Sequence, residues 1–270
     1  VYKRQGVNRP VDLAILGKLE DALPQFNKLL QQSSLPDNHS KSAKWRQEFE
    51  RERQESVAGL EGADTINPSK LMVEARKAVP DDAVIAIDSG LILMHQLAFF
   101  EKRSNEFLWT SKYGHLGSGM PYAIGAKLRV GDQPVCLLSG DGGIGFHFME
   151  FETAVRHQLA IVVIISDDQA LGAEMQPHVD HIGHTIEVSF SPVRYDLMAE
   201  AIGGHGEFVE KEEDIVAAVT RAFASGKPAI VQVKVDPQSA LKYPVPYGDE
   251  LMSWLMEDPE SRSSTSMSLW

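Results

Sequence analysis

The chain has 270 residues, of which 43% are hydrophobic, and its 26 Lys and Arg against 38 Asp and Glu give a formal net charge of −12. This length predicts one large domain, or one domain with a piece of another, and the apolar share is enough for a substantial core. The acidic balance argues against a surface for nucleic acid or an anionic membrane. It does not exclude a small anionic ligand, because backbone N–H groups bind phosphate locally.

Cysteine content and hydropathy bear on the compartment. The single cysteine, Cys136, excludes a disulfide framework within this sequence and favours a reducing, cytoplasmic location. It lies in an apolar run, so we expect a buried core residue. No stretch of the sequence reaches the ~18 apolar residues of a membrane helix. The start, VYKRQGVNRP, is polar, unlike a signal peptide, and lacks Met, so we expect a longer protein.

The N-terminal quarter differs in pattern from the rest of the chain. Residues 11–30, VDLAILGKLEDALPQFNKLL, predict a short strand, a glycine and a helix. We therefore interpret residues 1–35 as the C-terminal remnant of a central α/β domain, and residues 36–65 as a charged, mainly helical linker. Trp45 and Phe49 lie four residues apart, and we expect this aromatic face to pack on another surface.

Residues 66–240 alternate between strand and helix patterns, and residues 241–270 are interpreted as a C-terminal tail. Strands are expected at 83–88, 134–139, 160–166 and 228–236, and helices at 66–82, 117–130, 146–158, 194–204 and 212–226. The run AIVVII, before Ser166, is apolar throughout, as in a parallel strand covered on both faces. The predicted fold class is α/β, a three-layer α/β/α domain with a mainly parallel sheet. Ligands of such sheets bind beyond the carboxyl ends of the strands.

The segment GDGGIG, residues 140–145, follows one of these strands and admits two interpretations. Its glycines match G-x-G-x-x-G, the pattern of dinucleotide binding, and Asp167 and Asp168 are candidates for the acid that binds the ribose. Asp141, however, lies in the turn where a pyrophosphate would sit, and its carboxylate repels that ligand. A Mg²⁺ ion held by Asp141 and Asp168, at the ends of neighbouring strands, removes the conflict. The glycines then leave N–H groups free for phosphates.

Several motifs in order resemble the thiamine diphosphate-dependent enzymes, most closely the group of acetolactate synthase, benzoylformate decarboxylase and 2-hydroxyacyl lyase. That family has G-D-G, then a helix and a strand, then two adjacent Asn; the matching stretch here runs from GDGGIG to IISDDQALG. AIDSG resembles its D-x-G loop, and YGHLGSGMPYAIGAK resembles a helix start that follows. The resemblance covers roughly residues 66–237. It implies thiamine diphosphate and Mg²⁺ as cofactors, and decarboxylation or carbon–carbon ligation or cleavage of 2-oxo acids or 2-hydroxyacyl compounds.

The resemblance also implies individual metal and cofactor residues. Asp141 and Asp168 are implied as side-chain ligands of Mg²⁺, and Ala170 as a ligand through its backbone carbonyl. The implied cofactor-binding residues are Gly90, Gly114, His115, Leu116, Gly140, Asp141, Gly142, Gly143, Asp168, Ala170, Leu171 and Gly172.

Four of these residues have a defined part in holding the cofactor, by the same resemblance. Gly142 and Gly143 present N–H groups to the diphosphate. The carbonyl of Gly114 accepts a hydrogen bond from the 4′-amino group of the aminopyrimidine. Leu116 props the cofactor in a bent shape that brings this amino group near the thiazolium C2, so the protein supplies positioning and the cofactor the chemistry.

Two departures from the family pattern concern the site itself. Asp167 and Asp168 replace the Asn pair, which adds a negative charge beside the metal and the diphosphate. Leu91 and Ile92 stand where relatives often have polar side chains near the diphosphate. His95 is a candidate for lining the site, whereas the three His of EMQPHVDHIGH match no zinc pattern.

The third departure is the absence of the domain that carries the family's catalytic Glu, an N-terminal domain usually contributed by the partner subunit. We therefore expect no catalytic residue in this chain and no activity from it alone. A truncated three-domain enzyme is favoured over one subunit of a split enzyme, with a homodimer or homotetramer as the full-length form. Two alternatives stay open at this point: an NAD-binding Rossmann oxidoreductase domain, and a non-catalytic relative that has lost the cofactor.

Overall fold

The computed structural model describes residues 15, 17–33, 39–58, 65–101, 107–109 and 114–237. The chain divides into two compact units, Val1–Arg51 and Glu52–Trp270. In the first, α1 spans Leu19–Gln31, as expected, and α2, His39–Ala58, runs on into the second and makes most of the predicted linker helical. Most of the strand expected at 11–16, and the tail at 241–270, lie outside the described residues. The domain boundaries therefore stay predictions.

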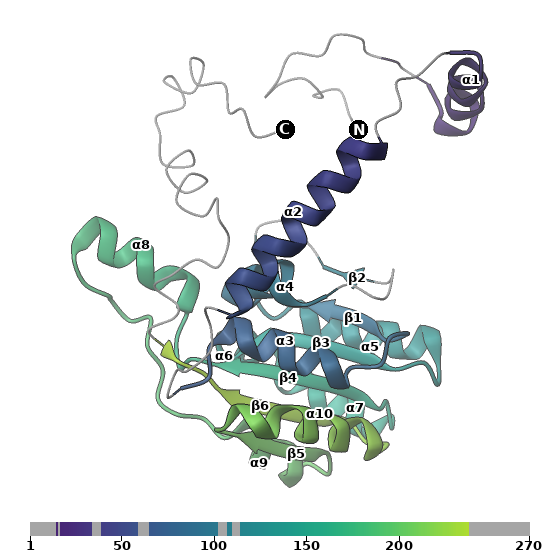
Figure 1. The fold of residues 1–270 in the computed structure, drawn as a ribbon. Helices are drawn as coiled ribbons and strands as arrows, with labels where there is room; N and C mark the ends of the chain where they lie inside the picture. Colours follow the sequence, from purple (N-terminus) through teal and green to yellow (C-terminus); the bar gives the residue numbers. More distant parts are fainter. Residues whose placement is uncertain are drawn as a thin grey trace. The chain divides into compact units, whose positions relative to one another are not determined.

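Within the described residues, the second unit is built on a six-stranded, all-parallel sheet with strand order β2-β1-β3-β4-β6-β5 (Figure 1). The strands are β1 (Val84–Ile87), β2 (Phe107–Leu108), β3 (Val135–Gly140), β4 (Ile161–Asp167), β5 (His205–Val209) and β6 (Ala229–Lys234). Every residue of β4 is buried, as its continuous apolar run predicts. The predicted strands at 83–88, 134–139, 160–166 and 228–236 are thus confirmed.

Helices cover both faces of this sheet (Figure 1). On one face lie α3 (Pro68–Ala78), α4 (Leu91–Phe99) and α10 (Ile215–Ala224), and on the other lie α5 (Gly119–Val130), α7 (Glu150–Arg156) and α9 (Tyr195–Ala201). Successive side chains of a strand point to opposite faces, so Cys136 packs with the first group of helices and Leu137 with the second. The three-layer fold class is therefore confirmed, and Cys136 is a fully buried core residue.

The single helix predicted over residues 146–158, after a glycine loop, is wrong. Instead α6 spans Asp141–His147 and α7 begins at Glu150, so GDGGIG is itself helical. Packing overrides the low helix propensity of glycine here, since Ile144 is buried in the core. The chain turns at Phe148, whose carbonyl accepts a hydrogen bond from the N–H of Phe151 at 2.8 Å. The first turn of a helix still leaves N–H groups without intrahelical partners, as the expected loop would.

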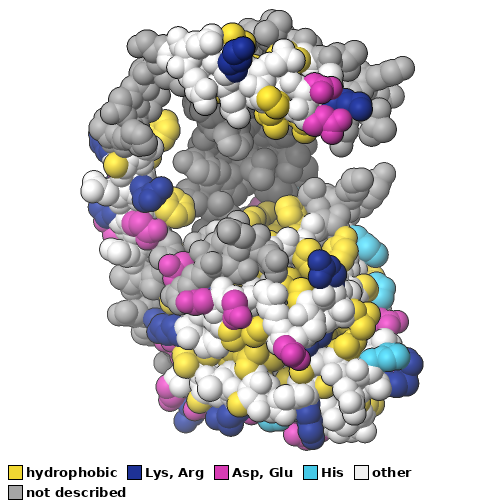
Figure 2. Space-filling model, turned by 90° about the vertical axis from the view of Figure 1, so that its right-hand side faces the viewer, with side chains coloured by type: hydrophobic (Ala, Val, Ile, Leu, Met, Phe, Trp, Pro, Cys, Tyr) yellow, Lys and Arg dark blue, Asp and Glu magenta, His cyan; other side chains and the backbone are white. Residues whose placement is uncertain are grey.

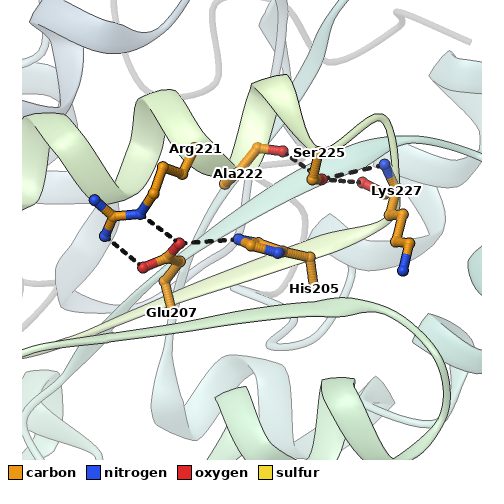
Figure 3. Close-up of polar contacts among 6 residues, drawn as sticks. All are labelled: His205, Glu207, Arg221, Ala222, Ser225 and Lys227. Carbon is orange, nitrogen blue, oxygen red and sulfur yellow. Dashed lines mark hydrogen bonds and ion pairs between the residues drawn. The ribbon is translucent and has the colours of Figure 1, made fainter.

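Several elements were not predicted: α4, β2, β5 and α8 (Gly172–Ile182). The helix expected at 212–226 begins as the 3₁₀ turn η1 (Glu212–Asp214) before α10. Glu207 connects the edge strand β5 to α10 (Figure 3). Its carboxylate accepts hydrogen bonds from the Arg221 Nε at 2.9 Å and Nη2 at 2.6 Å, and its Oε1 lies 2.9 Å from the His205 Nε2. Beyond them, the Ser225 hydroxyl donates to the Ala222 carbonyl at 2.7 Å and closes the end of α10 (Figure 3). These contacts anchor an edge strand whose sequence, HGEFV, has little apolar character.

Charges of both signs are interspersed on the described part of the surface seen in Figure 2, with hydrophobic side chains between them. Such mixing is typical of a solvated surface rather than a one-sign binding face. None of the helices in the described residues combines the length and hydrophobicity that crossing a bilayer requires.

Candidate cofactor site

A cavity of about 410 Å³ lies at the carboxyl ends of β1, β3 and β4, a volume in the range of small-molecule sites. It brings together segments that are far apart in the sequence, because the ends of parallel strands meet at one edge of the sheet. Eleven of the twelve residues implied as cofactor-binding line it: Gly90, Gly114, Leu116, Gly140, Asp141, Gly142, Gly143, Asp168, Ala170, Leu171 and Gly172.

His115 is the exception, because the structure does not place it in the cavity wall. Its side chain is exposed, and its ring packs edge-on against His147 with the ring centroids 6.2 Å apart. Its neighbour Leu116 faces the other way: a Cβ added to Gly90 would lie 3.4 Å from the Leu116 Cδ2. Leu116 therefore lies against the D-x-G loop, while His115 lies outside the site.

Asp88, the first residue of the D-x-G motif, organises one wall of the cavity. Its Oδ1 accepts hydrogen bonds from the N–H groups of Ser89 at 2.9 Å and Gly117 at 2.8 Å, and its Oδ2 accepts one from the Ser139 hydroxyl at 3.0 Å. The side chain is fully buried, and this burial raises the pKa of the carboxyl. Asp88 thus fastens the segment 114–119 to β1 and β3, a positioning part that the sequence did not reveal.

The two predicted metal ligands face one another across the ends of β3 and β4. Asp141 is the first residue of α6 and accepts a hydrogen bond from the Gly142 N–H at 2.9 Å. Asp168 follows β4 and accepts one from the Ala170 N–H at 3.2 Å. Burial, followed by the charges of Asp168 and Asp167, raises the pKa of Asp141, and burial raises that of Asp168. A bound cation relieves this repulsion by favouring both ionised forms.

Asp167, the extra carboxylate, is turned toward another partner. Its Oδ2 accepts a hydrogen bond at 2.7 Å from the Nε2 of Gln232, a fully buried side chain on β6. The same Nε2 donates to the Val193 carbonyl at 2.7 Å, and the Oε1 accepts from the Asp196 N–H at 3.3 Å. Gln232 therefore gives Asp167 a structural partner. Nothing in the sequence pointed to this pair, because the two residues meet only through the pairing of β4 with β6.

The residues present fit a Mg²⁺ ion that holds a diphosphate. Among the described residues, no group of three or more His, Cys, Asp or Glu is placed to hold a metal. Besides the two carboxylates, the coordination shell of the ion would therefore contain other oxygens, such as those of a backbone carbonyl, a phosphate and water, which suit a hard cation. A side chain at position 142 would meet the Leu171 Cδ2 at 2.9 Å. Glycine at this position leaves room for the Leu171 side chain beside the backbone of α6.

Most residues of the remaining cavity wall were not predicted from the sequence. Leu91 and Ile92 line it with apolar surface, as their departure from the family pattern indicated, and His95 lines it as well. Further lining residues come from α4, from beside β2 and from α8: Leu93, Met94, Trp109, Ala173, Glu174 and Pro177. The signal that would have found the α4 group is that Leu91 and His95 are four residues apart, on one helix face.

Comparison with known proteins decides between the interpretations of this site. The model of the family described as "Thiamine pyrophosphate enzyme, C-terminal TPP binding domain" matches residues 88–233. The chain belongs to this family. Its cofactor is therefore thiamine diphosphate, the same compound as thiamine pyrophosphate, with Mg²⁺ the usual partner metal of such enzymes. The NAD-binding alternative for GDGGIG is wrong.

Individual relatives agree with the family. Acetolactate synthase large subunit IlvG of Mycobacterium tuberculosis is 36% identical over 177 residues, 65% of this chain and 32% of that protein. 2-Hydroxyacyl-CoA lyase of Arabidopsis thaliana is 31% identical over 183 residues, 64% of this chain and 32% of the lyase.

Solved structures show the same likeness, within the same limits of coverage. A thiamine diphosphate-dependent 4-hydroxybenzoylformate decarboxylase of Rhodococcus jostii RHA1 superposes with a TM-score of 0.57 and 26% identity over 65% of this chain and 33% of that one. The chain spans about a third of the length of the curated relatives that it matches first.

Proposed function

We propose that this chain is the diphosphate-binding part of a thiamine diphosphate- and Mg²⁺-dependent enzyme that acts on 2-oxo acids or 2-hydroxyacyl compounds. The reaction would be decarboxylation, or ligation or cleavage of a carbon–carbon bond. The observation that carries the proposal is the convergence of Asp141, Asp168, Gly142 and Gly143 in one cavity. The relatives, named as a synthase, a lyase and a decarboxylase, support the reaction class.

In this proposal, each part of the cavity has a separate task. Asp141 and Asp168, with the Ala170 carbonyl, would hold Mg²⁺. The N–H groups of Gly142 and Gly143 would face the diphosphate at the N-terminus of α6, where the helix dipole favours negative charge; the Gly142 N–H, which donates to the Asp141 carboxylate in this structure, would exchange that acceptor for the diphosphate. The cofactor, when bound, supplies the site at which the carbanion of the reaction is stabilised. The apolar wall of α4 excludes water from this region, which strengthens the polar contacts inside it.

The proposal extends to the whole protein. The catalytic Glu would come from a further domain, so this chain alone would be inactive. The full-length form would be a homodimer or homotetramer, and a cytoplasmic location agrees with the single, buried Cys136.

Calorimetric titration of the complete protein with thiamine diphosphate, in Mg²⁺ and in EDTA, tests the proposal. We expect binding in Mg²⁺ that EDTA abolishes, and a loss of affinity of at least roughly 100-fold in Asp141→Ala, since metal affinity depends on each carboxylate ligand. Asp82→Asn is the matched control, because Asp82 is exposed before β1, at the opposite end of the strand. Binding that is indifferent to EDTA and to Asp141→Ala would refute the metal site.

The alternative of a relative that has lost the cofactor rests on Asp167, the extra negative charge, and on the apolar Leu91 and Ile92. It predicts no binding by the wild-type protein under either condition. Recovery of binding in Asp167→Asn would then show that this charge is the cause.

A further inference from the structure

Buried polar atoms without a partner gather on one side of the cavity. Among the described residues, the side-chain atoms of this kind are the Ser89 Oγ, the His95 Nε2, the Gln96 Oε1 and the His147 Nδ1. The first three lie in α4 or just before it, and Ser89 and His95 also line the cavity. A buried polar group without a hydrogen bond is costly, and it calls for an explanation such as a ligand.

His95 is held in a fixed orientation by α3. Its Nδ1 lies 2.8 Å from the Oγ of Ser69, and His95 and Ser69 are 2% and 3% exposed. Ser69 is itself fixed in the first turn of α3, where its N–H donates to the capping side chain of Asn67 at 2.8 Å. The imidazole ring therefore has one nitrogen committed to the protein and one, Nε2, left over.

The contact with Ser69 selects the tautomer of the ring. If the Ser69 hydroxyl donates to Nδ1, then Nε2 carries the proton, and every polar group of the pair is satisfied except that Nε2–H. In the opposite arrangement both the hydroxyl proton and the Nε2 lone pair lack partners, so the first is favoured. Burial lowers the pKa of His95 to about 4, which keeps the ring neutral near pH 7. His95 thus offers a single N–H donor.

The surroundings make this donor distinctive. Leu91 and His95 share one face of α4, and with Ile92, Met94 and Trp109 they line the cavity with mainly apolar side chains. The ionisable carboxylates of the lining lie on other elements: Asp141 begins α6, Asp168 follows β4 and Glu174 belongs to α8. A donor in a mainly apolar wall helps to fix the orientation of a ligand, since hydrogen bonds are stronger and more selective there; the unpartnered Ser89 hydroxyl lines the same cavity.

We propose that His95 is a ligand-binding residue of this cavity, whose Nε2–H donates a hydrogen bond to an acceptor oxygen of the bound molecule, and that Ser69 is the positioning residue that fixes its tautomer. The inference rests on the proposed function. The acceptor is an oxygen of an anionic ligand, supplied either by a phosphate of the cofactor or by the carboxylate of a 2-oxo acid.

The test compares His95→Phe, which keeps a ring and removes the donor, with His95→Gln, which keeps an N–H donor. His157→Phe is the matched control, because His157 is exposed at the end of α7. Each complete protein is titrated by calorimetry with thiamine diphosphate and with inorganic pyrophosphate in Mg²⁺. The loaded proteins are then titrated with pyruvate and with benzoylformate.

We expect His95→Phe to weaken one class of ligand by about tenfold, as for a lost hydrogen bond to a charged oxygen, and His95→Gln to recover part of it. Weaker binding of thiamine diphosphate and pyrophosphate identifies the phosphate. Unchanged cofactor binding with weaker 2-oxo acid binding identifies the substrate carboxylate. Affinities within twofold of wild type for all four ligands overturn the inference while the proposed function stands. Absence of any binding by the wild-type protein overturns both.

A spectroscopic readout covers the case in which His95→Phe fails to fold. In ¹⁵N NMR of the wild-type imidazole, we expect the proton on Nε2 and a shift of that signal when the ligand binds. Ser69→Ala should mix the tautomers, an effect that a purely structural contact would not produce. A proton found on Nδ1, or an Nε2 signal unmoved by every ligand, overturns the inference.

Discussion

Gln232→Leu is the substitution for which we expect the clearest loss of stability near the cavity. The Nε2 of Gln232 donates to the Asp167 carboxylate and to the Val193 carbonyl, both at 2.7 Å, from a side chain with 0% exposure. A hydrogen bond to a charged group contributes about 1.5–3 kcal/mol and one between neutral groups about 0.5–1.5 kcal/mol. Leucine has a similar volume and leaves little cavity, so we expect a loss of about 2–4 kcal/mol in the free energy of unfolding.

Urea denaturation followed by circular dichroism measures this loss as a lower midpoint with an unchanged slope. Gln133→Leu is the matched control: Gln133 donates to the Asp82 carbonyl at the surface, and we expect less than about 1 kcal/mol there. In the Gln232→Leu background, Asp167→Asn should cost less than it does alone, because it removes the carboxylate left unpaired. A loss below about 0.5 kcal/mol for Gln232→Leu, or strictly additive effects in this cycle, would show that the pair is not a stabilising contact.

Three further predictions concern separate features. Gly143→Ala should destabilise the protein by about 1–3 kcal/mol, since the added Cβ would lie 2.8 Å from the Asp88 Oδ2. The control is Gly125→Ala in α5, whose Cβ would meet nothing within 4 Å and which should stabilise the protein by up to about 1 kcal/mol through helix propensity. Equal urea midpoints for the two variants would contradict this prediction. The pKa of His95, about 4 when folded against 6.5 as the ordinary value, gives stability that is full above pH 6.5 and is lost as pH falls through 4, at most about 3 kcal/mol. His95→Gln should reduce the fall in the free energy of unfolding between pH 6.5 and 4. A fall equal to that of the wild-type protein would contradict this prediction. Burial raises the pKa of the Cys136 thiol to about 12, so a thiol reagent should label it only as the protein unfolds, and rapid labelling of the native protein would disprove the placement.

The sheet could be read from the sequence because its central strands carry a strong signal. Residues 160–165 are apolar throughout, and such a run is typical of a strand covered on both faces. β5 escaped notice because HGEFV mixes polar and apolar residues after two glycines, and its place in the sheet depends on Glu207 and its partners. α4 escaped because LILMHQLAF is apolar on most sides, and its N-cap, Gly90, makes no side-chain hydrogen bond. Local pattern alone separates a buried helix poorly from a buried strand.

The convergence of Asp141 and Asp168 at one edge of the sheet could be predicted because these residues follow strand ends in a parallel sheet, where sequence order translates into spatial proximity. Contacts between side chains of elements that are distant in the sequence could not be predicted in this way. Gln232 meets Asp167 only through strand register, and Ser69 meets His95 only through the packing of α3 on α4. His115 was misplaced because a motif assigns positions along the chain, whereas adjacent residues in a turn face opposite ways.

The position of β6 in the sheet has a consequence for how the protein is made. β6 is the last strand along the described chain, yet it lies inside the sheet, between β4 and β5. Until the ribosome has released residues 229–234, the backbone N–H and C=O groups on one edge of the mainly apolar strand β4 lack their β6 partners, and such an edge favours wrong strand pairing. Over the same interval, the Asp167 carboxylate lacks its hydrogen-bond donor, Gln232. Synthesis from the N- to the C-terminus thus completes the sheet and the contact between Asp167 and Gln232 in one late step, and we expect a nascent chain stopped before residue 229 to be exposed to aggregation with the sheet beside the cavity incomplete.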